Sequence, residues 1–325
     1  MRPELSIERI HTTRDKLKDF VNITPTVRWE HSGPENLFPK GTEVFVKLEL
    51  FQKTGSFKVR GAMNVIQSLD PAELSRGITA VSAGNHAIAA AYAASKKSTS
   101  ALIFMPKTAR KLRVERAINF GARVILCDTQ TEMFERAEEA KIQEGRTFVH
   151  PFEGPMTVQG TATVGLEFSE QVSDIDVMIL PIGGGGLCAG FSAAIRQIWP
   201  NVEIYGVEPE GANTMAISFK SGKTIVKENV NTIADSLAPP KTEPYTFSVC
   251  KELVDDIVLV SDDALRDAMQ ILFYDLRLAV EPAAAATAAA LCGPLQGRIA
   301  GKRVGIICCG TNISSEDFFK LSKLK

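Results

Sequence analysis

Short apolar segments that alternate with helical segments constrain the fold of this chain more than any other feature. Strands are predicted at 44–50, 78–81, 101–105, 123–127, 147–149, 176–182, 203–208, 257–260 and 303–308. Helices are predicted around and between them, at 9–20, 58–69, 86–95, 109–119, 131–144, 187–198, 213–220, 262–276, 282–291 and 315–323. Strands and helices that alternate in this way form mostly parallel sheets with helices on both faces. The predicted fold class is therefore α/β.

Lys58 stands where a predicted helix begins, just after a predicted strand and the turn Lys53-Thr54-Gly55. Ser56 is the expected N-cap of this helix. The positive end of the helix dipole disfavours a lysine cation, so this position lowers the pKa of the amine. A neutral lysine attacks aldehydes, and the aldehyde cofactor that enzymes hold on a lysine is pyridoxal phosphate (PLP). The alternative is an ordinary solvated lysine at a helix start.

A polar turn, Ser82-Ala83-Gly84-Asn85-His86, follows the predicted strand 78–81 and precedes an alanine-rich helix. Such a turn aims several backbone N–H groups, together with the Ser82 and Asn85 side chains, at one point. This arrangement suits the binding of a carboxylate. The alternative is an ordinary strand–helix connection with an N-capping serine or asparagine.

A glycine loop connects the strand 176–182 to the helix 187–198, and it consists of Gly183, Gly184, Gly185 and Gly186, followed by Leu187. Four glycines let the backbone wrap a phosphate with N–H donors, because no Cβ atom stands in the way. The loop lacks the Lys-Ser/Thr ending of a P-loop and does not match G-x-G-x-x-G. It therefore indicates a plain phosphate group more than a nucleotide. A flexible linker is the alternative, which the strand and the apolar helix on either side disfavour.

These segments, in this order, resemble the fold-type II PLP-dependent enzymes of the threonine/serine dehydratase and serine racemase family. The resemblance covers nearly the whole chain, through residues 47–62, 82–86, 181–187, 206–212, 232–235, 280–282 and 309–314. It implies two domains with the cofactor between them. The large, discontinuous PLP-binding domain would comprise residues 1–75 and 153–325, and the small domain residues 76–152.

The resemblance also implies roles for individual residues. Lys58 would bind PLP as an imine and act as the general base for the substrate Cα proton. Ser82, Ala83, Gly84, Asn85 and His86 would bind the substrate carboxylate. The other cofactor contacts would be Phe57 beside the pyridine ring, Asn85 at its 3′-oxygen, Gly183 to Leu187 around the phosphate, and Cys309 or Cys308 near the ring nitrogen. A thiol cannot keep that nitrogen protonated as a carboxylate can, which favours β-elimination over reactions that need a long-lived carbanion.

Departures from the family pattern refine this interpretation. Racemases of the family carry a serine where this chain has Ala83, so racemisation is expected to be poor. Phe152, Leu237, Pro239 and Pro240 replace residues that are often polar or small, so the pocket for the substrate side chain is expected to be apolar. Variation of surface loops is the alternative explanation.

No metal site is expected. Relatives bind a divalent cation near the segment 206–212, where Glu208 is present. The next carboxylate of the pattern is replaced by Thr214, and a hard cation needs several oxygen ligands.

The predicted function is that of a PLP-dependent ammonia-lyase (dehydratase) that converts a β-hydroxy-α-amino acid to a 2-oxo acid and ammonia. Threonine and serine are the expected substrates, with a phenylserine as a bulkier variant. The alternative enzyme is a serine or threonine racemase, and the alternative of another class is a non-catalytic protein that binds PLP or a phosphate ligand. The chain ends soon after 309–314, so no regulatory domain is expected and a catabolic role is favoured.

Composition limits the partners of this chain to small molecules and copies of itself. The net charge of −1 over 325 residues, without a basic cluster, argues against nucleic acid, and no apolar run is long enough for a membrane span. The six cysteines show no metal-ligand spacing, which predicts reduced thiols in a cytoplasmic protein. We expect a homo-oligomer, and specifically a dimer. His11 and His150 are isolated in the sequence and receive no predicted role.

Overall fold

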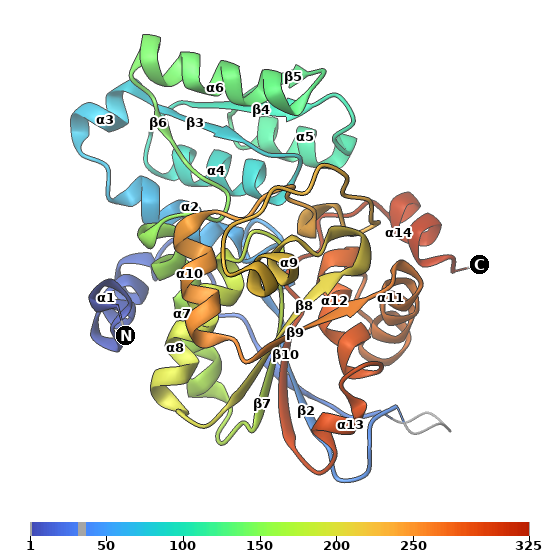
Figure 1. The fold of residues 1–325 in the computed structure, drawn as a ribbon. Coiled ribbons are helices and arrows are strands. Elements are labelled where there is room, and N and C mark those ends of the chain that lie inside the picture. Colours follow the sequence, from blue (N-terminus) through green and yellow to red (C-terminus); the bar gives the residue numbers. More distant parts are fainter. Residues whose placement is uncertain (1, 32–36, 325) are drawn as a thin grey trace.

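The computed structural model describes residues 2–31 and 37–324 and contains, within them, two β-sheets (Figure 1). The larger sheet has the strand order β1 (Thr26–Trp29), β2 (Glu43–Lys47), β10 (Arg303–Ile307), β7 (Val177–Pro181), β8 (Glu203–Pro209) and β9 (Asp256–Val260). All neighbours in it are parallel except β1 and β2. The smaller sheet has the order β5 (Arg123–Cys127), β4 (Ala101–Pro106), β3 (Ile78–Val81) and β6 (Thr147–Phe148), and it is parallel throughout. The predicted α/β class with mostly parallel sheets is confirmed.

Helices cover both sheets. The α-helices are α1 (Ile7–Leu17), α2 (Lys58–Gln67), α3 (Pro71–Arg76), α4 (Asn85–Lys96), α5 (Lys111–Asn119), α6 (Gln130–Glu144), α7 (Pro155–Gln171), α8 (Gly186–Ile198), α9 (Thr214–Ser221), α10 (Pro244–Leu253), α11 (Asp262–Leu276), α12 (Pro282–Leu291), α13 (Gln296–Ile299) and α14 (Ser315–Ser322). Short 3₁₀ turns occur at Pro3–Leu5, Glu49–Phe51, Glu210–Ala212 and Asp235–Leu237. In Figure 1, α7 and α8 lie on one side of the larger sheet and α11 and α12 on the other.

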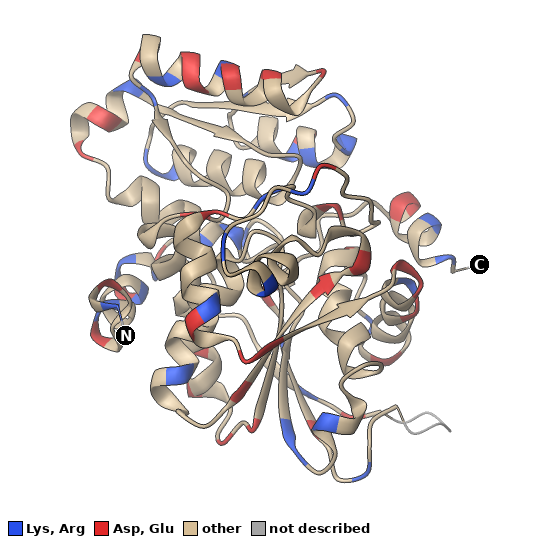
Figure 2. Ribbon diagram, viewed as in Figure 1, with Lys and Arg blue, Asp and Glu red and all other residues tan. Residues whose placement is uncertain are grey.

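Charged residues lie mainly on the outer helices, with both signs interspersed, as on α6 (Figure 2). The central strands carry few charges, which agrees with their burial. No helix in residues 2–31 and 37–324 combines the length and the apolar character needed to cross a membrane. All six cysteines are free thiols.

The longest helix of the fold, α7, has no counterpart among the predicted helices. Its sequence contains threonines, valines and two internal glycines, which have low helix propensity. It is also buried on all sides between residues 157 and 168, so it lacks the apolar stripe that reveals a surface helix. Packing between α2 and α8 therefore stabilises a helix that the local sequence does not predict.

The expected capping role of Ser56 is wrong. The helix α2 begins at Lys58, and its N-cap is Phe57, which makes no side-chain capping bond. Ser56 is instead held in an isolated bridge with Gly310, while the backbone N–H of Phe57 donates to the carbonyl oxygen of Cys309. Pairing with the segment that follows β10 thus determines the conformation ahead of α2.

The smaller sheet lies entirely within residues 78–148, inside the predicted small domain. The helix α2, predicted to belong to the large domain, contributes Val59, Met63 and Ile66 to the same buried cluster as Ile78 of β3. One helix therefore packs under the smaller sheet while it also contacts α7 of the other part. The predicted boundaries at residues 76 and 152 stay a prediction.

Gly160 on α7 permits the close approach of α7 to α2. A Cβ atom at this position would lie 2.7 Å from the Cα atom of Gly61 and would overlap the carbonyl oxygen of Arg60. We expect Gly160→Ala to lower the free energy of unfolding by about 1–3 kcal/mol, because two buried helices must move apart. Urea denaturation measures this change.

The matched control is Gly297→Ala on α13, where a Cβ atom would have no neighbour within 4 Å. Its free energy of unfolding should be unchanged or raised by up to about 1 kcal/mol, since alanine is the better helix former. Equal responses of the two variants would contradict the packing argument.

Candidate active site

The residues predicted to hold the cofactor surround one small cavity between the two sheets. Its lining includes all of them, namely Phe57, Lys58, Asn85, Gly183, Gly184, Gly185, Gly186, Leu187 and Cys309. The N-terminal ends of α2, α4 and α8 converge here, since these helices begin at Lys58, Asn85 and Gly186. In parallel α/β proteins, ligands bind at the carboxyl ends of the strands, which is where α4 and α8 begin.

The glycine loop forms a cradle that a side chain would fill. A Cβ atom on Gly184 would overlap the ring of Phe152, and one on Gly186 would lie 2.7 Å from the carbonyl oxygen of Phe152. Gly185 has a φ of +90°, which other residues rarely adopt. Within the described residues, the N–H groups of this loop make no backbone hydrogen bond. Free donors at the start of a helix of 13 residues fit a phosphate group.

Lys58 lines the same cavity, and its amine donates to the carbonyl oxygen of Pro151 at 2.6 Å. Burial lowers the pKa of Lys58 to about 8, and the nearby Cys309 and Glu281 oppose this shift only in part. The direction agrees with the sequence argument, but burial is the main cause and not the helix dipole alone. A substantial fraction of the amine is therefore neutral near pH 8, as a nucleophile or base requires.

Glu281 also lines the small cavity, although the sequence analysis assigned this residue no role. Its carboxylate is only 1 % exposed and accepts hydrogen bonds from the Asn85 amide and, at 3.0 Å, from the Arg113 guanidinium. The Asn85 oxygen accepts in turn from the Asn312 amide at 2.6 Å. Burial raises the pKa of Glu281, although Arg113 opposes the change. The motif Val280-Glu281-Pro282 was visible, but a lone glutamate in it does not reveal these contacts.

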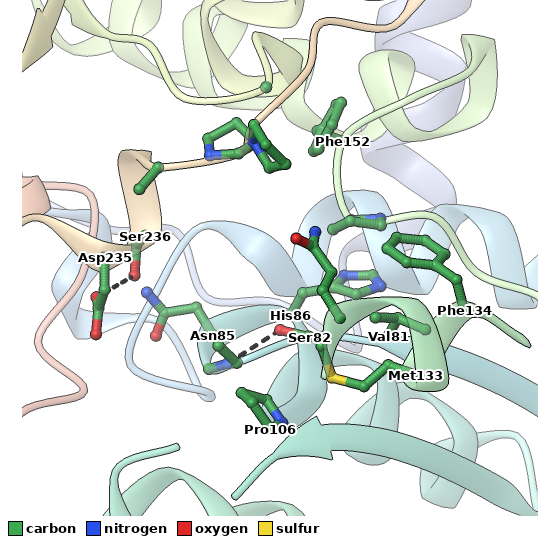
Figure 3. A pocket seen from close by; sticks show the side chains of 18 of the residues that line it. Val81, Ser82, Asn85, His86, Pro106, Met133, Phe134, Phe152, Asp235 and Ser236 are labelled. Atoms are coloured by element: carbon green, nitrogen blue, oxygen red, sulfur yellow. Dashed lines mark hydrogen bonds between the residues drawn. The ribbon is translucent and has the colours of Figure 1, made fainter. Parts of the chain in front are cut away.

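A larger cavity of about 470 Å³ adjoins the first and contains the predicted carboxylate-binding turn. Its lining includes Lys58 and Gly184, shared with the small cavity, and all of Ser82, Ala83, Gly84, Asn85 and His86. Figure 3 shows Asn85, Asp235 and Ser236 on one side of this space and His86, Met133 and Phe134 on the other. The structure therefore brings the predicted substrate-binding and cofactor-binding residues together. Their individual roles stay a prediction.

The polar side chains of the turn 82–86 are held by hydrogen bonds within the protein. The Ser82 hydroxyl accepts from the N–H of Gly84 at 3.0 Å. The His86 ring donates from Nε2 to the carbonyl oxygen of Val149 at 2.8 Å. Burial, together with Lys58, lowers the pKa of His86 to about 3, so the ring is neutral and structural. The first N–H groups of α4 therefore remain the predicted donors for a carboxylate.

Part of the wall of the larger cavity is apolar. This apolar wall includes Val81, Pro106, Met133, Phe134, Phe152, Pro239 and Pro240. The placement of Phe152, Pro239 and Pro240 agrees with the expected apolar pocket. The placement of Leu237 does not, because the 3₁₀ turn Asp235–Leu237 directs it into the small cavity, against Gly183.

His150 lines the larger cavity as well, although sequence reasoning set it aside as an isolated histidine. Its Nδ1 atom accepts from the N–H of Phe152 at 3.3 Å and from that of Glu153 at 2.9 Å. No spacing in the sequence signals this placement. It arises because the segment after β6 passes between the two sheets.

Glu208 has its own protein partners at the place considered for a metal. Both carboxylate oxygens accept backbone N–H groups at the start of α9, from Met215 at 2.9 Å and from Ala216 at 2.7 Å. Burial raises the pKa of Glu208 to about 8. No cluster of metal-ligating side chains occurs within residues 2–31 and 37–324.

Comparison with known proteins agrees with this geometry. Residues 17–310 match the model of the family described as pyridoxal-phosphate dependent enzyme. Phenylserine dehydratase of Ralstonia pickettii is 45% identical over 97% of this chain and 95% of its own length. L-threonine ammonia-lyase of Thermotoga maritima is 40% identical over 84% of this chain and 68% of its own length. The solved structure of maize serine racemase superposes with a TM-score of 0.89 at 35% identity, over 97% of this chain and 96% of that one.

The chain therefore belongs to the pyridoxal-phosphate dependent enzymes, and within them it has the fold of the type II group. PLP is its cofactor. The residues present fit this group, since the cavity joins a lysine of lowered pKa to a glycine cradle with free N–H donors.

Replacement of Lys58 tests its assignment as the residue that binds the cofactor covalently. Borohydride reduction of the wild-type protein should attach the cofactor irreversibly to the peptide that contains Lys58. Mass spectrometry should detect this adduct in the wild-type protein and not in Lys58→Ala. Turnover should fall by about three orders of magnitude or more, because nucleophile and base are lost together.

Lys53→Ala is the matched control, since Lys53 lies in the preceding turn and its amine is exposed. It should keep both the adduct and the activity. A Lys58→Ala variant that retains more than about a hundredth of the wild-type rate would place the reactive lysine elsewhere.

Proposed function

We propose that this protein is a PLP-dependent ammonia-lyase (dehydratase) that converts β-hydroxy-α-amino acids to 2-oxo acids and ammonia, with aryl-serines among its substrates. The observation that carries this proposal is the composition of the larger cavity. Lys58 and the turn predicted to bind a carboxylate line this cavity together with the residues of the apolar wall. The similarity to phenylserine dehydratase and L-threonine ammonia-lyase supports the same reaction class.

The cofactor and the residues of the protein have separate roles in the proposed reaction. PLP supplies an electron sink for the bond that breaks at the substrate Cα atom. The N–H groups of the turn 82–86 hold the substrate carboxylate and so orient the Cα–H bond. The neutral amine of Lys58 takes the Cα proton at Nζ, and the carbonyl oxygen of Pro151 keeps this atom at the junction of the two cavities. Loss of the β-hydroxyl as water and hydrolysis of the resulting enamine give the 2-oxo acid and ammonia.

Two features favour elimination over racemisation. Ala83 has no proton to return to the second face of the Cα atom. Burial, with Glu281 and Cys308 nearby, raises the pKa of Cys309 well above its usual value, so the residue proposed to lie near the ring nitrogen remains a neutral thiol. Reactions that need a long-lived carbanion are then disfavoured, whereas early departure of the β-hydroxyl is not.

The assembly and the location of the protein are parts of the same proposal. A homodimer is supported by two exposed apolar side chains, Ile23 (80% exposed) and Phe51 (50% exposed). Their segments are linked by a hydrogen bond from the Asn22 side-chain amide to the carbonyl oxygen of Phe51. A cytoplasmic location is supported by the six free cysteines. Two domains, divided near residues 76 and 152, are supported by the two separate sheets. Sedimentation equilibrium of the purified protein measures the oligomeric state.

The substrate preference tests the apolar wall. We expect kcat/KM to rise from serine to threonine and aryl-serines to be accepted, because each buried CH₂ group contributes about 0.8 kcal/mol. An assay of 2-oxo acid formation over a panel of β-hydroxy amino acids measures the ranking. Phe152→Asn should flatten or invert it, whereas Phe152→Leu, which keeps an apolar side chain, should not. Serine as the best wild-type substrate would refute the proposal for the pocket.

Ala83→Ser tests the preference for elimination. The introduced hydroxyl should raise the ratio of racemisation to elimination, because it provides a proton donor on the face opposite Lys58. Chiral analysis of the recovered substrate, alongside 2-oxo acid release, measures this ratio. If the wild-type enzyme racemises its substrate as fast as it eliminates water from it, Ala83 does not limit racemisation and this proposal is wrong.

A further inference from the structure

His150 presents a hydrogen-bond donor of fixed position to the larger cavity. Its Nδ1 atom accepts two backbone N–H groups, from Phe152 and Glu153. The proton of the neutral ring must therefore be on Nε2. Burial, Lys58 and Lys241 lower the pKa of His150 to about 3, so this tautomer persists at neutral pH. The result is an N–H group whose direction is set by the backbone.

Glu243 provides an acceptor beside this donor. Its Oε1 atom lies 3.9 Å from Nε2 of His150, which is too far for a direct hydrogen bond. Within the described residues, this nitrogen makes no hydrogen bond. Lys241 lies 2.7 Å from the same Oε1 atom, which keeps the carboxylate in place. One oxygen atom can lie about 2.8 Å from both Nε2 and Oε1, which are hydrogen-bonding distances. A hydroxyl group completes this pair, since it accepts from the imidazole and donates to the carboxylate.

The pair lies beside the aromatic part of the cavity wall. The His150 ring makes an edge-to-face contact with Phe152, with 4.6 Å between the ring centroids. The Lys241 amine lies 6.0 Å from the centroid of Phe134. His150, Phe134, Phe152, Lys241 and Glu243 all line the same cavity. The Lys241 side chain is 47% exposed, and Lys241, Glu243 and His150 do not line the small cofactor cavity, whereas Phe152 lines both cavities.

We propose that His150 and Glu243 form a subsite for a hydroxyl group at the far end of the substrate side chain, so that hydroxyaryl-serines are bound in preference to unsubstituted aryl-serines. This inference rests on the proposed function, because the aromatic ring must occupy the apolar wall for its hydroxyl to reach the pair. Both members of the pair are assigned to substrate binding and not to bond breaking.

Equilibrium binding tests this subsite without turnover. L-Tyrosine and L-phenylalanine differ only in the ring hydroxyl, and neither has a β-hydroxyl group to eliminate. Titration of the PLP-loaded enzyme with each, followed by the change in cofactor absorbance, gives two dissociation constants. We expect the wild-type enzyme to bind tyrosine about tenfold or more tightly than phenylalanine, because a hydrogen bond to a charged group is gained.

Three substitutions at the pair separate the donor from the acceptor, and a fourth at an exposed position is the control. His150→Asn keeps an oxygen that can accept the Phe152 and Glu153 N–H groups but removes the donor at the Nε2 position, and Glu243→Ala removes the acceptor. Both should bring the ratio of the two dissociation constants to about one while leaving the phenylalanine constant within about twofold. His150→Gln, whose amide nitrogen can replace Nε2, should restore part of the preference. Glu138→Gln, at an exposed position on α6, is the control and should keep the wild-type ratio.

The outcomes distinguish this inference from the proposed function. Equal binding of tyrosine and phenylalanine by the wild-type enzyme, or a preference that survives in both His150→Asn and Glu243→Ala, overturns the hydroxyl subsite alone. Binding of serine or threonine without binding of either aromatic amino acid overturns the proposed aryl-serine substrates instead.

Discussion

The buried carboxylate of Glu281 and the side chains that bind it hold the two sheets in their relative positions. Arg113 and Asn85 belong to helices that flank the smaller sheet, and both donate to Glu281 just before α12. Arg113 also donates to Asp235 at 2.9 Å and to the carbonyl oxygen of Asn312 at 3.0 Å. Loss of one member of a buried charged pair typically costs about 3–5 kcal/mol, because the other charge is left unpaired. The distance between the sheets, and with it the width of both cavities, depends on this network.

A second buried network supports the helix that carries Lys58. Arg60 is fully buried and forms ion pairs with Glu49 at 2.7 Å and with Glu167 at 3.1 Å. Lys47, at the end of β2, pairs with the same Glu167 at 2.7 Å. These ion pairs connect β2, the 3₁₀ turn Glu49–Phe51, α2 and α7. Arg60, which takes part in two of them, is two residues from the reactive lysine. A fixed helix start keeps the amine within reach of both the cofactor and the substrate.

Local sequence patterns were sufficient for most of the sheet architecture. The apolar runs that became β3, β4, β7, β8 and β10 end at or close to their predicted limits, because parallel strands buried on both faces are continuously apolar. The strand β1 and the helices α3, α7, α10 and α13 were not predicted. For α7 the reason is physical, since a helix buried on all sides has neither an amphipathic pattern nor, with its glycines and threonines, high propensity. Ser56 failed as a cap because a distant partner, Gly310, holds it in an extended bridge.

The sequence by itself determined the chemical groups of the site. Lys58, the turn 82–86 and the glycine loop 183–186 are each local features at a strand–helix junction, where the backbone at a helix start creates the function. Only the tertiary structure decided which side chains from distant segments complete that site. Arg113, His150 and Glu243 carry no local signal, and the motif 280–282 does not reveal the contacts of Glu281, because these roles arise from contacts between residues that are far apart in the chain. The same long-range packing turned Leu237 away from the larger cavity and left Phe152 in its wall.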